Sequence, residues 1–199
     1  MAIQNSADQK TNVGLAAGAG IVSGIVSGLL LEPAVEVMES LTVLADTLTG
    51  ILFPMAMSAG LVFGVIGAIF GLSRLGFRPL VAALWFTGSI VGMGAAFYVS
   101  ILTYDSSNSG GADFIIPYLC ASPVGALILG GPLVLLRPYA AKLKLLAALV
   151  VLPSLLALGV AVLMGVQQAD DALSLSWLIP LYVGWQTLFL TTLAMWRRA

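Results

Sequence analysis

Residues 13–31, VGLAAGAGIVSGIVSGLLL, decide the fold of this chain. The stretch has no charged residue, and a helix of this length, at about 1.5 Å per residue, crosses the roughly 30 Å hydrocarbon core of a membrane. Small residues recur at every fourth position and share one face of the helix: Ala16, Gly20, Gly24 and Gly28. Because close backbone contact and dispersion hold helices together in lipid, this face predicts a tight packing seam with another helix.

The overall composition is also that of a membrane protein. Of the 199 residues, 60% are hydrophobic and 9% are charged, and the mean hydropathy is +1.07. A soluble domain has about 25% charged residues, which keep its surface in water. We therefore expect one integral membrane domain, entirely α-helical, that covers residues 1–199.

The composition excludes several classes of function. The formal net charge is −1, and no long block of lysine and arginine is present, so nucleic-acid binding is not expected. The chain has no histidine, and Cys120 is its one cysteine. Because disulfides need two cysteines and most metal and haem sites use histidine or several cysteines, we expect no metal and no cofactor.

Five further uncharged runs are long enough to span a membrane. Together with residues 13–31 they predict a compact bundle of six transmembrane helices. The five predicted spans are about 49–73, 79–103, 114–136, 145–166 and 173–196.

Between the first two spans, residues 33–48 predict an amphipathic helix that lies along the membrane surface. Acidic residues recur on one side of it: Glu32, Glu36, Glu39 and Asp46. Aliphatic residues recur on the other side. An acidic platform over residues 32–46 that binds a cation or a basic partner is the alternative that stays open.

The charged residues fall at alternate ends of the successive spans. All lysines and arginines lie on one side: Lys10, Arg74, Arg78, Arg137, Lys142, Lys144, Arg197 and Arg198. The acids lie on the other side, except for Asp8. Because basic loops stay in the cytoplasm, we expect both termini there, in a bacterial cytoplasmic membrane or an organelle inner membrane.

The four-residue spacing of small residues returns in four other spans and predicts close packing there. It is formed by Gly60 and Gly64, by Gly88 and Gly92, by Ala121 and Gly125, and by Ala157, Ala161 and Gly165. The sixth span is bulky along most of its length. We expect it to form an outer wall of the bundle or a surface for a partner.

The fourth predicted span, FIIPYLCASPVGALILGGPLVLL (114–136), is the irregular one. It contains Pro117, Pro123 and Pro132, and each proline removes a backbone donor and clashes with the preceding turn. Two interpretations stay open. The prolines either only kink the helix or mark a broken helix at a substrate site.

Few residues inside the six predicted spans are candidates for catalysis or ligand binding, because no span contains Asp, Glu, Lys, Arg or His. No catalytic residue is predicted. Gln186 is the one strongly polar side chain deep in a span, and it either bonds another helix or meets a ligand. The candidate ligand-binding residues are Gln186, Trp185, Ser122, Pro123, Gly130 and Gly131.

Two functions fit these residues. The first is a non-catalytic subunit of a larger membrane complex, whose partners are the lipid bilayer and other subunits or a second copy. The alternative is a small permease or solute-binding transport component for a neutral or apolar compound.

The chain resembles the substrate-binding subunits of energy-coupling-factor vitamin transporters. The resemblance lies in the number of spans, the placement of both termini, the length and the small-residue first helix. That resemblance implies solute binding and includes no site motif. A membrane enzyme is disfavoured because no acid–base pair lies at depth.

Overall fold

The computed structural model describes residues 2–40, 54, 56–103, 115–136, 141–166 and 175–196. Nearly all of these residues are helical, and none is in a strand. The helices are α1 (Ala2–Leu29), α2 (Leu31–Ser40), α4 (Val62–Phe70), α5 (Pro79–Thr103), α6 (Ile115–Leu136), α7 (Lys142–Val166) and α8 (Leu175–Met195). Two π-helical segments, η1 (Ala56–Leu61) and η2 (Gly71–Leu75), flank α4 and continue it at both ends.

Six of these helical stretches are long and apolar enough to cross a membrane, so the prediction of an all-α polytopic bundle is confirmed. The stretches are Gln9–Leu29, Ala56–Leu75, Pro79–Thr103, Ile115–Leu136, Lys142–Met164 and Trp177–Met195. The predicted span 79–103 coincides with α5. The largest difference is at α1, which begins at Ala2 rather than at 13, because residues 2–12 contain no glycine or proline to interrupt it.

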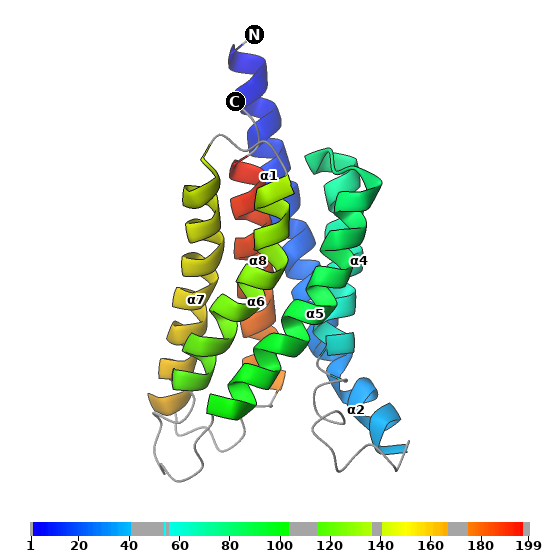
Figure 1. Ribbon diagram of the computed structural model, residues 1–199, viewed down its shortest axis with the longest axis vertical. Helices are drawn as coiled ribbons and strands as arrows, with labels where there is room; N and C mark the ends of the chain where they lie inside the picture. Colours follow the sequence, from blue (N-terminus) through cyan, green and yellow to red (C-terminus); the bar gives the residue numbers. More distant parts are fainter. Residues whose placement is uncertain are drawn as a thin grey trace.

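The six spans form a closed ring. α1 packs on α8, α8 on α7, α7 on α6 and α6 on α5, and the second span lies between α5 and α1. The first turns of α1 extend beyond the rest of the bundle (Figure 1). There the Gln9 side chain donates to the backbone carbonyl of Met195 over 3.0 Å, which joins the first helix to the end of the last.

The glycine face of α1 lies against α8. A Cβ atom on Gly20 would lie 2.7 Å from the backbone nitrogen of Thr187, and a Cβ on Gly24 would lie 2.7 Å from the carbonyl carbon of Tyr182. A Cβ on Gly28 would instead collide with the side chain of Ile179. Only glycine lets the two backbones approach this closely. Ala16, the fourth residue of the face, is fully buried.

The sixth span was expected to form an outer wall or a surface for a partner. α8 lies between α1 and α7, and 50% of its span is buried, compared with 33% for α5. It is therefore one of the two most buried spans and is not a mainly exposed wall, and the partner surface stays a prediction. The physical reason is the glycine face of α1, which lets the backbone of α8 come close at Gly20 and Gly24.

Two other predicted small-residue faces also lie at helix contacts. Gly60 and Gly64 pack on α5, where a Cβ on Gly60 would lie 2.9 Å from the carbonyl oxygen of Ser89. Gly92 of α5 faces Gly125 of α6, and a Cβ on Gly92 would lie 3.1 Å from the Gly125 carbonyl oxygen. Gly88 makes only ordinary contact with Leu129, at 3.6 Å.

The irregular span is the second one and not the fourth. α6 runs as one α-helix with Pro123 and Pro132 inside it, so the alternative of a broken helix is not observed and the alternative without a break remains. Each proline removes only one donor, and close packing on α5 holds the rest of the helix in place. The second span instead changes from α-helix to π-helix at both ends.

α2 follows α1 directly and lies at the end of the bundle opposite the chain termini (Figure 1). Leu31 is buried, whereas Glu32 and Glu36 are exposed on one side. The first part of the predicted surface helix 33–48 is therefore helical, and residues 41–48, with Asp46, lie outside the described residues.

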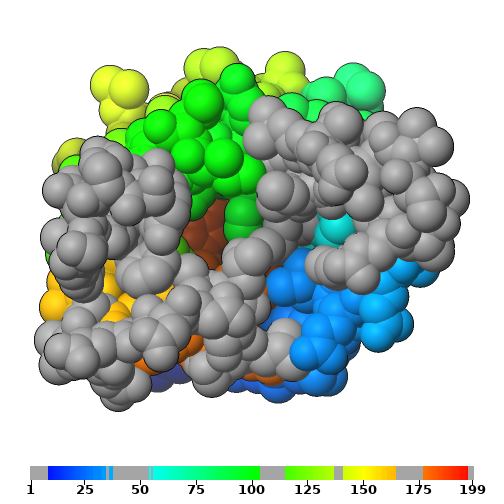
Figure 2. Space-filling view, turned by 90° about the horizontal axis from the view of Figure 1, so that it is seen from below, coloured from blue at the N-terminus to red at the C-terminus, as the bar shows by residue number. Residues whose placement is uncertain are grey.

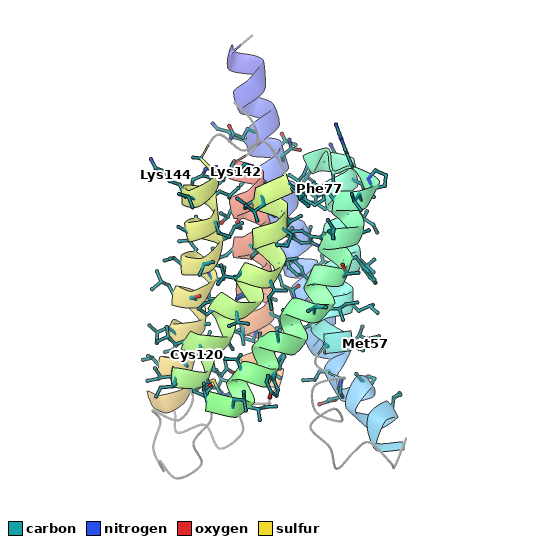
Figure 3. The ribbon with its side chains drawn as sticks, viewed as in Figure 1. Met57, Phe77, Cys120, Lys142 and Lys144 are labelled. Atoms are coloured by element: carbon teal, nitrogen blue, oxygen red, sulfur yellow. The ribbon has the colours of Figure 1, made fainter. Side chains whose placement is uncertain are left out.

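The described charges separate along the long axis of the bundle. Lysines and arginines are exposed at the end where α1 begins, as Lys142 and Lys144 illustrate in Figure 3. The exposed acids of α2 lie at the other end. We call these the basic end and the acidic end. Lys142 also donates to the carbonyl oxygen of Leu135 over 2.9 Å, in the last turn of α6.

Candidate functional site

An aromatic cluster fills the centre of the ring from its middle toward the basic end. Its members are Phe63, Phe77, Trp85, Trp185 and Phe189, all buried. The ring centroids of Phe63 and Trp85 lie 5.2 Å apart, edge to face, and those of Trp185 and Phe189 lie 5.1 Å apart in a stack. The Trp85 indole nitrogen donates to the Phe63 carbonyl oxygen over 3.2 Å. The indole nitrogen of Trp185 also has an acceptor, Ser122 Oγ, so both polar atoms of the cluster are hydrogen-bonded.

Glycines of the second span make room for this cluster. A Cβ atom on Gly67 would collide with the Trp85 indole, and a Cβ on Gly71 would collide with the Phe77 ring. Phe77 lies near the basic end (Figure 3). The second span thus packs closely on α5 and on the residue Phe77 that precedes it, because large rings occupy the space that a side chain at Gly67 or Gly71 would need.

Buried polar side chains lie at the middle of the bundle. Each is within about one turn of the centre of its span, and none is more than 8% exposed. We call them the central polar layer: Ser23, Ser89, Ser122, Ser154 and Gln186. In hydrocarbon such groups need hydrogen-bond partners, since no water competes to satisfy them.

One part of this layer is completely hydrogen-bonded. The Trp185 indole nitrogen donates to Ser122 Oγ over 2.9 Å. Ser154 Oγ lies 2.6 Å from the carbonyl oxygen of Val150 and 3.2 Å from Ser122 Oγ. A hydroxyl has one hydrogen and a carbonyl only accepts, so Ser154 donates to Val150 and Ser122 donates to Ser154. Every hydrogen in this three-helix network has an acceptor.

The other part is not complete. Gln186 points toward α1, where its Nε2 donates to Ser27 Oγ over 3.1 Å. Three atoms next to this bond have no hydrogen-bond partner among the described residues: Gln186 Oε1, Ser23 Oγ and Thr187 Oγ1. Ser23 lies one turn from Ser27 on the same face of α1. We call Ser23, Ser27 and Gln186 the open cluster.

The six candidate ligand-binding residues are therefore separated. Trp185 and Ser122 are joined by a hydrogen bond, while Gln186 belongs to the open cluster on the other side of α8. Pro123 is half-buried in α6. A Cβ on Gly130 would lie 3.3 Å from Leu149 and Phe189, so this glycine serves packing. Gly131 meets no described atom within 4 Å and is not part of either cluster.

Sequence reasoning missed Ser23 and Ser27. Their signal is the repeat SGIVSG, in which each serine directly precedes a glycine of the seam. A four-residue spacing of serines places both hydroxyls on one face, beside the face of Gly24 and Gly28. That pattern marks a polar stripe next to a close helix contact.

A hollow opens at the acidic end of the bundle. Figure 2 shows it beside α5, with atoms of α8 visible at its floor. The buried aromatic cluster lies on the side of the interior toward the basic end.

No family model, curated protein or solved structure matches this chain. The resemblance to energy-coupling-factor binding subunits thus depends on span number and composition alone. Among the described residues, no group of three or more His, Cys, Asp and Glu is placed to hold a metal ion. Cys120 is half-buried near the acidic end (Figure 3). What the interior offers a ligand is hydroxyl, amide and aromatic groups.

Proposed function

We propose that this protein is a membrane-embedded binding component for a small neutral solute that enters from the acidic end. The observation that carries the proposal is the division of the ring interior. Aromatic rings pack together in its basic half, a hollow opens toward α8 from the acidic end, and buried polar groups without partners among the described residues lie near mid-depth. A subunit with a purely structural role has no need for unsatisfied polar groups at mid-depth.

The solute is neutral because the interior offers no counter-charge. The buried polar residues that the structure describes are serine, threonine, asparagine and glutamine, and the described lysines, arginines and glutamates are exposed. An ion without a partner at this depth has a high desolvation cost. Hydroxyl and amide groups instead suit a neutral molecule with a few hydrogen-bonding atoms.

In this proposal the basic end of the bundle faces the cytoplasm, in a bacterial cytoplasmic membrane or an organelle inner membrane. The support is the separation of the exposed charges along the bundle axis, since lysine and arginine are retained on the cytoplasmic side. Both ends of the chain then lie in the cytoplasm. The hollow opens on the opposite side, where a solute is taken up from outside.

The test is the composition of the protein purified in mild detergent. We expect mass spectrometry of the intact, folded protein to find one small neutral molecule bound to it, released when the protein unfolds. Absence of any such molecule, with lipid and detergent as the only bound species, contradicts solute binding. A stoichiometric partner protein and no solute is the result that favours the second candidate.

That second candidate is a subunit of a larger membrane complex. The observation in its favour is on the outer face of α1, where Gly14 and Gly18 lie four residues apart, are exposed, and meet no described atom within 4 Å. A partner helix is able to approach such a surface closely. A binding component that also uses this surface to join a transport complex satisfies both candidates.

A further inference from the structure

We propose that the open cluster contacts the solute directly, and that Gln186 Oε1 and Ser23 Oγ recognise a neutral amide edge, an N–H beside a carbonyl. This inference rests on the proposed function and names the polar groups of that site. It adds Ser23, on the first span, to a site that the sequence assigned to the fourth and sixth spans.

The first argument is that the Ser23 hydroxyl, like that of Thr187, has no hydrogen-bond partner among the described residues. Hydroxyls in apolar helices ordinarily donate to a carbonyl three or four residues earlier in their own helix. The serines and threonines with such bonds are Ser73, Thr87, Ser89, Thr103, Ser154 and Thr191. Ser23 is fully buried and has no such bond and no other partner among the described residues. Its hydrogen is therefore available for a ligand.

The second argument is the half-used amide of Gln186. Its nitrogen is bonded to Ser27, whereas its oxygen accepts nothing from the described residues. The side chain is fully buried, so solvent outside the bundle does not supply the missing hydrogen. An amide oxygen in hydrocarbon needs a donor. The donor expected here is an N–H or O–H of the solute.

These two atoms together define the ligand chemistry. Gln186 Oε1 only accepts, and the Ser23 hydroxyl has a hydrogen to donate. A solute group that meets both has a donor and an acceptor on neighbouring atoms, as in a primary amide, a urea or a lactam. The complete network of Ser122, Ser154 and Trp185 offers no open hydrogen and is not the recognition site.

The position of the cluster fits entry from the acidic end. Gln186 is the central residue of the α8 span, directly after Trp185 of the aromatic cluster. A solute that descends the hollow reaches α8, the helix that carries Gln186 (Figure 2). Both open atoms are enclosed, so the solute reaches them when the flexible Gln186 side chain turns away from Ser27.

The test compares two probes that differ only in their N–H groups: acetamide, and N,N-dimethylacetamide, which keeps the carbonyl and lacks the donor. We expect acetamide to raise the thermal unfolding midpoint of the full-length protein and dimethylacetamide to leave it unchanged, since only a bound ligand stabilises the folded state. Ser23→Ala and Gln186→Leu are expected to abolish the acetamide effect. Ser89→Ala, which removes an equally buried hydroxyl bonded within its own helix, is the matched control and keeps it.

An equal response to both probes, no response to acetamide, or a full acetamide effect in Ser23→Ala contradicts the inference. The Ser23 variant keeps the test decisive if Gln186→Leu fails to fold. These outcomes are separate from the mass measurement of the purified protein. If that measurement finds a bound neutral molecule while both variants retain it, the solute-binding function stands and the assignment of the open cluster is wrong.

Discussion

At the scale of single residues, the interior polar groups divide by whether their hydrogens are used. Ser122 is the centre of the complete network, because it accepts from Trp185 on α8 and donates to Ser154 on α7. The sequence identified Ser122, Trp185 and Gln186 as polar or amphipathic residues at depth. It did not indicate that neighbours Trp185 and Gln186 point to different helices, because that depends on which helices lie on each side of α8.

Replacement of Ser122 by alanine is expected to destabilise the fold. The change leaves the buried Trp185 N–H without an acceptor and Ser154 without its donor, which costs about 1–3 kcal/mol for a buried unpaired group. The measurement is the thermal unfolding midpoint in detergent. Ser89→Ala serves as the control, because its hydroxyl bonds the carbonyl of Trp85 in its own helix and joins no other helix, so a smaller loss is expected there. Equal loss in both variants would show that the network adds no stability.

At the scale of helices, the seam between α1 and α8 organises the bundle. The spacing of Ala16, Gly20 and Gly24 predicted a close contact, and those residues are buried. The spacing defines a face but not the neighbour that covers it. For this reason the sequence located the seam on the first helix and did not identify the sixth helix as its partner.

Leucine at Gly20 and Gly24 is expected to prevent α1 from docking on α8. The new side chains would occupy the position of the Thr187, Tyr182 and Val183 backbone, where no rotamer change relieves the overlap. The loss of stability is expected to be about 3 kcal/mol or more, since backbone has to move. Yield of folded protein after gel filtration is the measurement.

The control is leucine at Gly14 and Gly18, on the same helix and with the same spacing but with no described atom within reach. This variant is expected to fold as the wild type does. If the protein joins a larger complex through the outer face of α1, the control variant also loses that partner. Wild-type stability of the Gly20 and Gly24 variant would contradict the packing of α1 on α8.

The helix bounds were more predictable than the internal geometry. α5 was predicted to the residue, because Pro79 suits the first turn of a helix and the charged Arg78 precedes it. The π-helical ends of the second span were not predicted, and neither were the contacts of Gly67 with Trp85 of α5 and of Gly71 with Phe77, which precedes α5. The aromatic cluster was missed as well. The spacing of residues along each helix and the amino-acid composition do not specify which aromatic rings come into contact across the bundle.

At the scale of the whole molecule, the separation of charge gives the protein an axis. Single cysteines at Arg78 and Glu36, each introduced into a Cys120→Ser background, test how that axis is oriented. A membrane-impermeant thiol reagent added to intact cells is expected to label the Glu36 cysteine and not the Arg78 cysteine. Permeabilised cells are the control and label both. Labelling of both in intact cells, or of the Arg78 cysteine alone, would reverse or remove the proposed orientation.

The contact of α1 with α8 has a consequence for biosynthesis. Among the six spans α1 is made first and α8 last, yet each is the other's main partner. The nascent α1 therefore waits in the bilayer, with its glycine groove facing lipid or an insertion factor, until four more helices have been translated and inserted. Ring closure is the final step of assembly, and any ribosome stall before α8 leaves an open bundle exposed to membrane quality control.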